Sequence, residues 1–147
     1  MKPNDALLAA VVVNGLLAGA SLDQSIEQLP ARHRIGPRAY SAYSRASHRA
    51  NGRFWLVPLG LGGPLLTVGA AAMAGRSRLP LLAAGLALAH VLSTAKAASV
   101  NLTQWRPGVD DAMLADILQR FARWQALRAG LQFLTFVVSA MALAERR

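Results

Sequence analysis

The chain has 147 residues, which is enough for one domain and too few for two domains with well-buried cores. Hydrophobic residues make up 54% of it, yet 16 Lys and Arg stand against 7 Asp and Glu, a combination that is unusual for a soluble globule. The charges lie between long apolar runs, which argues against a nucleic-acid-binding face. Since there is no cysteine, disulfides, iron–sulfur clusters and thiolate metal sites are excluded.

Four apolar runs predict four membrane-spanning helices, because each approaches the ~20 residues that a helix needs to cross a bilayer core. We expect the spans at residues 6–26, 54–75, 79–101 and 127–145 of a single domain, 1–147. For the first run, a cleaved signal peptide is the alternative, since Lys2 precedes it and Ala18-Gly19-Ala20 resembles a cleavage site. Three further apolar runs favour a span.

The connections predict how the helices are arranged. The short link at residues 76–80 makes the second and third helices antiparallel neighbours. Both other connections are long and helical in pattern: Pro37 suits a first helical turn, and Asp110 and Asp111 begin a segment with one apolar face. We therefore expect an all-α, four-transmembrane-helix antiparallel bundle with helices two and four extended on the cytoplasmic side. The positive-inside rule puts both long, arginine-rich connections in the cytoplasm of a cell-membrane protein, which in a bacterium means the inner membrane.

Polar groups at membrane depth are costly, so each is a candidate for function. On the first helix, Asn14 and Ser21 share a face that Gln24 extends, and these residues either line a cavity or join helices by hydrogen bonds. Asp23 and Glu27 lie one turn apart at the membrane edge, where pairing with nearby arginines competes with binding of a metal or proton.

The third helix carries His90, with Thr94 and Asn101 on its face. A lone buried histidine is commonly a satisfied core residue. If His48, near the start of the second helix, converged with His90, the two imidazoles could form part of an acid–base site or a metal site. Arg128 on the fourth helix either extends its side chain to the interface or neutralises an anionic substrate oxygen.

Arg45, Arg49 and Arg53 form a basic stripe that we expect to contact anionic lipid head groups and, secondarily, a phosphate-bearing ligand. The sequence contains no phosphate-cradling glycine loop, dinucleotide fingerprint, zinc-binding helix or nucleophile elbow. No metal site is expected, and no cofactor can be recognised from a motif. Any catalysis must therefore come from scattered groups.

Several short motifs, taken together, resemble a known family. They are Leu29-Pro30-Ala31-Arg32, Ile35-Gly36-Pro37, the segment from Arg45 to Gly52, and Asn101 followed by Trp124 and Arg128. These motifs are similar to those of the anthrone-oxygenase-like family of small four-helix membrane proteins, many of which are labelled only as a domain of unknown function. Relatives often have an acidic residue just before an Asn-Gly pair, whereas this chain has His48 ahead of Asn51 and Gly52.

The resemblance implies oxygenation of anthrone-type polycyclic phenols to quinones without a motif-recognisable cofactor. A base that deprotonates an electron-rich phenol lets the substrate itself reduce oxygen. The candidates are His48 or His90 for the base, and Asn101, Asn14 or Arg128 for the oxyanion. We expect a pocket for a hydrophobic aromatic substrate from the bilayer, lined by Asn14, Ser21, Gln24, Asn51, Thr94 and Trp124.

A non-enzymatic membrane protein is the competing interpretation, either an accessory subunit or a binder of a lipid, quinone or haem. The discriminating feature is whether Asn14, His90, Asn101 and Arg128 face one cavity or separately satisfy one another. Small residues permit close helix packing and self-association into a homo-oligomer under either interpretation. They are Gly15, Gly19, Gly60, Gly63 and Gly85.

Overall fold

The computed structural model describes residues 2–146, and for Asn51 and Arg53 it describes the backbone only. In chain order the elements are α1 (Pro3–Asp23), the π-helical turn η1 (Gln24–Gln28), α2 (Leu29–Ile35), α3 (Pro37–Ser47), the π-helical turn η2 (His48–Gly52), α4 (Arg53–Met73), α5 (Arg78–Thr103) and α6 (Asp111–Ala144). No strand occurs in this part of the chain, so the all-α prediction is confirmed.

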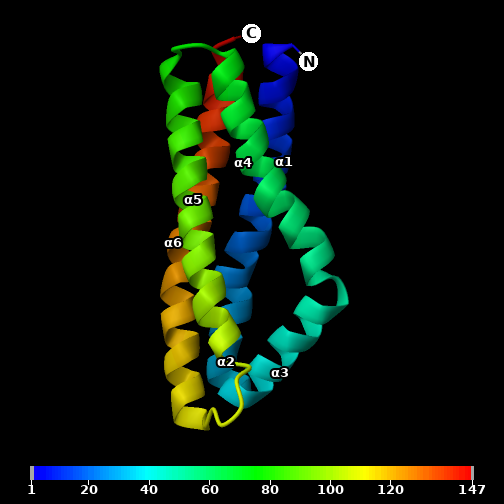
Figure 1. Ribbon diagram of the computed structural model, residues 1–147, viewed down its shortest axis with the longest axis vertical. Helices are drawn as coiled ribbons and strands as arrows, with labels where there is room; N and C mark the ends of the chain where they lie inside the picture. The colour runs from blue at the N-terminus through cyan, green and yellow to red at the C-terminus, as the bar shows by residue number, and fades with distance from the viewer. Residues whose placement is uncertain (1, 147) are drawn as a thin grey trace.

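The four long helices α1, α4, α5 and α6 form an elongated bundle (Figure 1). Both ends of the chain and the turn between α4 and α5 lie at one end of it. The opposite end, which we call the connector end, is formed by α2, α3 and the loop between α5 and α6. There α3, η2 and the start of α4 bow away from the other helices before α4 joins them (Figure 1).

Four helical segments are long and apolar enough to cross a membrane. They are Pro3–Ile35, Phe54–Met73, Arg78–Thr103 and Asp111–Ala144. Large apolar side chains such as Leu65 and Leu92 are exposed on their outer surfaces, as helices in contact with lipid require. The first and last segments have 33 and 34 residues. At 1.5 Å per residue each is about 50 Å long, which exceeds a bilayer core of about 30 Å.

The first helix continues beyond residue 26, where the predicted span ends. In η1 the backbone N–H of Leu29 bonds to the carbonyl oxygen of Gln24, five residues earlier. This wider turn directly precedes Pro30, which lacks an N–H and whose ring would crowd an ordinary helical turn. The helix therefore passes the proline and ends only before Gly36, whose φ of 87° suits glycine and reverses the chain.

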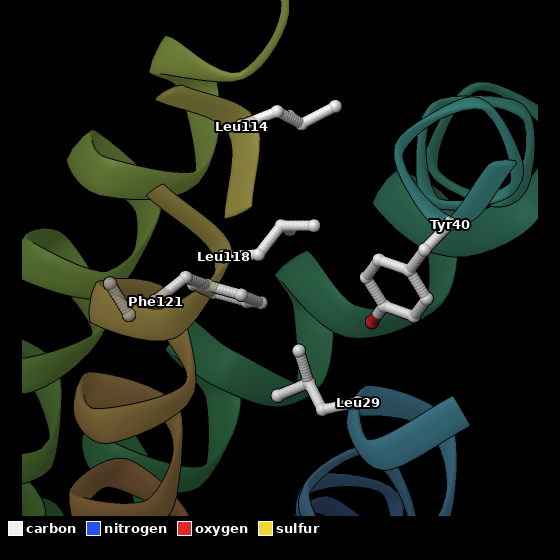
Figure 2. Packing of buried hydrophobic residues seen from close by; sticks show 6 residues of the cluster. Leu29, Tyr40, Leu114, Leu118 and Phe121 are labelled. Atoms are coloured by element: carbon white, nitrogen blue, oxygen red, sulfur yellow. The ribbon is translucent and has the colours of Figure 1, made fainter. Parts of the chain in front are cut away.

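At the connector end, α3 is held by an apolar cluster. Figure 2 shows the Tyr40 ring on α3 directed toward Leu29 at the start of α2 and toward Leu118 and Phe121 on α6. Tyr40 is only 2% exposed. This cluster holds α3 against the bundle, and α3 in turn forms part of one wall of a pocket at the connector end.

Candidate functional site

Buried polar side chains run through the middle of the bundle. They are Asn14, Ser21, Thr67, His90, Ser93, Gln125, Gln132, Thr135 and Ser139. On α6 the members recur at intervals of three, four and seven, so Gln125, Gln132 and Ser139 share one face with Arg128. This spacing is visible in the sequence, yet of these residues only Arg128, which is half-buried, was a predicted site residue.

Three polar contacts join α1 and η1 to neighbouring helices. Asn14 donates through Nδ2 to Oγ1 of Thr67 on α4 at 2.8 Å. Gln125 on α6 donates through Nε2 to the backbone oxygen of Ser21 at 3.2 Å. Near the connector end, Arg128 donates through Nη2 to Oε1 of Gln24 at 3.0 Å. Each contact crosses between helices, so these groups tie the bundle together rather than surround one cavity.

His90 lies on α5 and is 1% exposed. Neither of its ring nitrogens has a hydrogen-bond partner among the described residues. Its backbone oxygen accepts from the hydroxyls of Ser93 and Thr94, which occupies both hydroxyls within α5. At helical rise, His90 lies about 16 Å along α5 from Asn101. It therefore belongs to the helix interior rather than to the pocket at the connector end.

A pocket of about 420 Å³ lies between the two π-helical turns. We call it the π-turn pocket. One wall comes from the end of α1 and η1, the other from α3, η2 and the start of α4, and α5 contributes Asn101. The lining residues are Ala20, Asp23, Gln24, Gln28, Tyr40, Tyr43, Ser44, Ser47, His48, Ala50, Gly52, Trp55, Leu56 and Asn101. Its volume lies in the range of roughly 300–1,000 Å³ that is typical of small-molecule sites, and π-helical turns are frequent at functional sites.

Polar groups in the π-turn pocket have defined orientations. Asn101 accepts at Oδ1 a hydrogen bond from Nε2 of Gln104, which leaves its Nδ2 as the donor for a ligand. The carboxylate of Asp23 accepts from Nε2 of Gln28. The His48 ring packs on Trp105, with centroids 5.9 Å apart and planes tilted by 39°. The donor Nδ2 of Asn101 and the imidazole of His48, which packs on Trp105, therefore border the same pocket.

Tyr40 brings a phenol to this pocket. Burial, and secondarily the neighbouring Tyr43, raises the pKa of Tyr40 to about 12, with Arg32 acting in the opposite direction. The hydroxyl therefore stays protonated at neutral pH and can serve as a hydrogen-bonding group, not as a base. His48 contributes an imidazole to the same lining, the group that most often serves as a general base.

The structure brings some of the predicted site residues together and separates others. His48, Gln24 and Asn101 line the π-turn pocket. Outside its lining lie Asn14, Ser21, Thr94, His90, Trp124 and Arg128. Trp124 packs against the apolar cluster around Leu118, and Arg128 reaches the pocket only through Gln24. The side chains of Asn51 and Arg53 lie outside what the structure describes.

Among the described residues, no group of three or more His, Asp or Glu side chains is arranged to hold a metal ion. Glu27 is exposed and Asp23 faces the pocket with Gln28.

No protein-family model, no curated protein and no solved structure matches the chain.

Proposed function

We propose that the chain is a four-span antiparallel membrane protein, with the connector end in the cytoplasm, that binds an aromatic phenol in the π-turn pocket and oxygenates it. An anthrone-type compound converted to a quinone is the proposed reaction. The observation that carries this proposal is that His48 and Asn101, 53 positions apart in the sequence, line one pocket with the aromatic side chains of Tyr40, Tyr43 and Trp55.

The π-turn pocket lies at the ends of the apolar segments, a position that suits a substrate that partitions into lipid. Trp55 and Leu56 lie at the start of the apolar segment Phe54–Met73, and Asn101 lies near the end of the segment Arg78–Thr103. The pocket thus borders the edge of the apolar spans. An aromatic ring system can enter from the hydrocarbon side while its hydroxyl groups stay near the polar residues of η1 and η2.

The chemistry requires a base and a donor. His48 takes the proton from the substrate, and Nδ2 of Asn101 donates a hydrogen bond to the resulting oxyanion. The electron-rich anion then reduces dioxygen. In the balanced reaction the substrate's CH₂ group becomes a carbonyl, one oxygen atom of O₂ enters the product, and the other leaves as water. The four electrons come from the substrate.

One observation favours a second candidate, a non-catalytic binder of an aromatic or quinone-type molecule. Asn14 donates to Thr67 and Arg128 donates to Gln24, and neither residue belongs to the lining, so these two polar groups do not join His48 around the pocket. Binding of the ligand requires the pocket alone, whereas catalysis also requires His48 to act as a base.

The test uses the full chain in lipid nanodiscs with anthrone as the probe, following oxygen uptake and quinone absorbance against empty nanodiscs. We expect His48→Gln to lower the enzymatic rate by about 100-fold or more, since a positioned base contributes about 10²–10⁴. His33→Gln is the matched control, because His33 is exposed on α2 and lies outside the pocket lining. Ligand binding without turnover supports the binder, and absence of both overturns the proposal.

A further inference from the structure

A second pocket, of about 520 Å³, lies between α3 and the loop that joins α5 to α6. Four arginines are among its lining residues, so we call it the arginine pocket. The lining is Arg38, Ser41, Ala42, Arg45, Ala46, Arg49, Gln104, Trp105, Arg106, Gly108, Val109 and Leu114. It shares no lining residue with the π-turn pocket. The function proposed for that pocket leaves the arginine pocket unexplained.

The arginine pocket has an excess of positive charge. Arg38 forms an ion pair with Asp111, with Nη2 and Oδ1 2.6 Å apart. Within residues 2–146 the structure gives Arg45, Arg49 and Arg106 no carboxylate partner. Arg45 and Arg49 are four residues apart on the helix that forms one wall, and Arg106 comes from the opposite wall. Three guanidinium groups around one hollow favour an anion.

Two further polar groups in the arginine pocket lack partners. Gln104 is only 5% exposed, and its Nε2 donates to Asn101 while its Oε1 has no partner in the described part of the chain. The indole Nε1 of Trp105 is likewise buried and unpaired there. Buried polar atoms ordinarily find hydrogen bonds. Because both residues line the arginine pocket, its wall contains one unpaired N–H donor and one unpaired carbonyl acceptor beside the arginines. A bare anion cannot satisfy the acceptor.

We propose that the arginine pocket binds a phosphate group that carries a hydroxylated substituent, with phosphoglycerol as the simplest example. The guanidinium groups of Arg45, Arg49 and Arg106 bind the phosphate oxygens, for which their planar N–H pairs are suited. Trp105 Nε1 donates to a further oxygen of the ligand. A ligand hydroxyl donates to Oε1 of Gln104, which accounts for the acceptor that phosphate alone would leave unpaired.

Phosphoglycerol occurs both in lipid head groups and in soluble esters, and the position of the pocket is compatible with either source. Gln104 and Trp105 directly follow the apolar segment that ends at Thr103, and Arg49 precedes the segment that begins at Phe54. Basic pockets at this level are typical sites for anionic head groups. Arg45 and Arg49, two of the three residues of the stripe predicted from the sequence, line a pocket because the α5–α6 loop supplies Arg106, Gln104 and Trp105.

The test compares two double variants that lose the same charge. Arg45→Gln/Arg49→Gln removes two pocket arginines, and Arg34→Gln/Arg123→Gln removes two exposed arginines outside the pocket lining. Native mass spectrometry counts phosphatidylglycerol and phosphatidylcholine retained from nanodiscs of mixed composition. Calorimetry measures the binding of glycerol 1-phosphate and of inorganic phosphate. We expect the pocket variant to weaken binding by about tenfold or more, since two charge-assisted contacts are lost, and the control variant to bind as the unsubstituted chain does.

The pattern of binding identifies the source. Selective retention of phosphatidylglycerol that is lost only in the pocket variant supports a lipid head group. Binding of glycerol 1-phosphate with the same dependence, without lipid selectivity, supports a soluble ester. Trp105→Phe keeps an aromatic ring but removes the N–H. It should weaken binding of whichever probe, phosphatidylglycerol or glycerol 1-phosphate, the unsubstituted chain binds. Equal loss in both double variants, or no binding of any phosphate probe to the unsubstituted chain, overturns the proposal.

Discussion

Asn14 on α1 and Thr67 on α4 are joined by a buried hydrogen bond of 2.8 Å from Nδ2 to Oγ1. Thr67 in turn donates to the carbonyl oxygen of Gly63, one turn earlier, also at 2.8 Å. A Cβ on Gly63 would lie 2.7 Å from Oδ1 of Asn14. The absence of a side chain at Gly63 therefore lets Asn14 reach Thr67, and the three residues form one interhelical contact.

Gly63→Ala should lower the stability of the bundle by about 1–2 kcal/mol, because Asn14 must rotate away and lose an interhelical bond of that size. Thermal unfolding in detergent, followed by circular dichroism, measures the change. Gly60→Ala is the matched control on the same helix, since a Cβ there meets no atom within 4 Å. Asn14→Ala combined with Gly63→Ala should cost no more than Asn14→Ala alone. Additive losses would show that the two residues do not act through one contact.

The helices could be predicted from the sequence because run length and hydropathy are local properties. Spans near residues 54–75 and 79–101 correspond to α4 and α5 within a few residues. The continuation of the first helix through Pro30 was missed, since proline ordinarily limits a helix and a π-helical turn leaves no simple sequence signal.

The candidate site was predictable only in part. His48 and Asn101 stand out as polar groups beside apolar runs, but their shared pocket depends on the chain reversal at Gly36 and on the packing of Tyr40. These are tertiary contacts, which periodicity cannot reveal. The polar face of α6 needs no tertiary contact to be predicted. Gln125, Gln132 and Ser139 recur every seven residues, a spacing that is visible in the sequence and that places them on one helix face.

Gln24→Leu should destabilise the protein by about 1.5–3 kcal/mol, the range for a hydrogen bond to a charged group. The substitution removes the oxygen that accepts from Arg128 at 3.0 Å, and the structure shows no carboxylate partner for Arg128 within residues 2–146. Thermal unfolding in detergent measures the loss. Gln28→Leu is the control, because Gln28 also lines the π-turn pocket but bonds to the exposed Asp23.

The contact between Gln24 and Arg128 also predicts the stability of a variant in which both residues are replaced. Gln24→Leu/Arg128→Met removes the cation together with its acceptor, so it should be more stable than Gln24→Leu alone. If the double variant is less stable than either single variant, the two side chains act independently and the contact is not the source of the effect.

His90→Leu should leave the thermal stability unchanged or raise it by about 1–3 kcal/mol, which is the usual cost of a buried polar group without a partner. The described residues donate no hydrogen bond to the ring and accept none from it, so the substitution breaks no contact within the chain. Asn14→Leu serves as the comparison, since it removes the bond to Thr67 and should be destabilising. A marked loss of stability in His90→Leu alone would mean that a bound molecule pairs with the imidazole.

The raised pKa of Tyr40 predicts that the folded protein loses stability at high pH. This pKa is raised from 10.0 to about 12, chiefly by burial, so the folded protein resists ionisation of this phenol. In the unfolded chain the phenol ionises near its ordinary pKa of 10.0. The contribution of Tyr40 to stability is therefore fully present below pH 10 and is lost between pH 10 and about 12.

Absorbance of the tyrosinate ion measures this titration directly. In Tyr43→Phe the signal comes from Tyr40 alone, since the chain has two tyrosines. We expect a midpoint well above 10 and close to 12 in the folded protein, because burial, the largest cause of the shift, remains when Tyr43 is removed. The same variant unfolded in denaturant should titrate near 10. A folded-state midpoint equal to the unfolded one would mean that Tyr40 is solvated. The apolar cluster with Leu118 and Phe121 would then not hold α3 against α6, and the wall that α3 gives to the π-turn pocket would be lost with it.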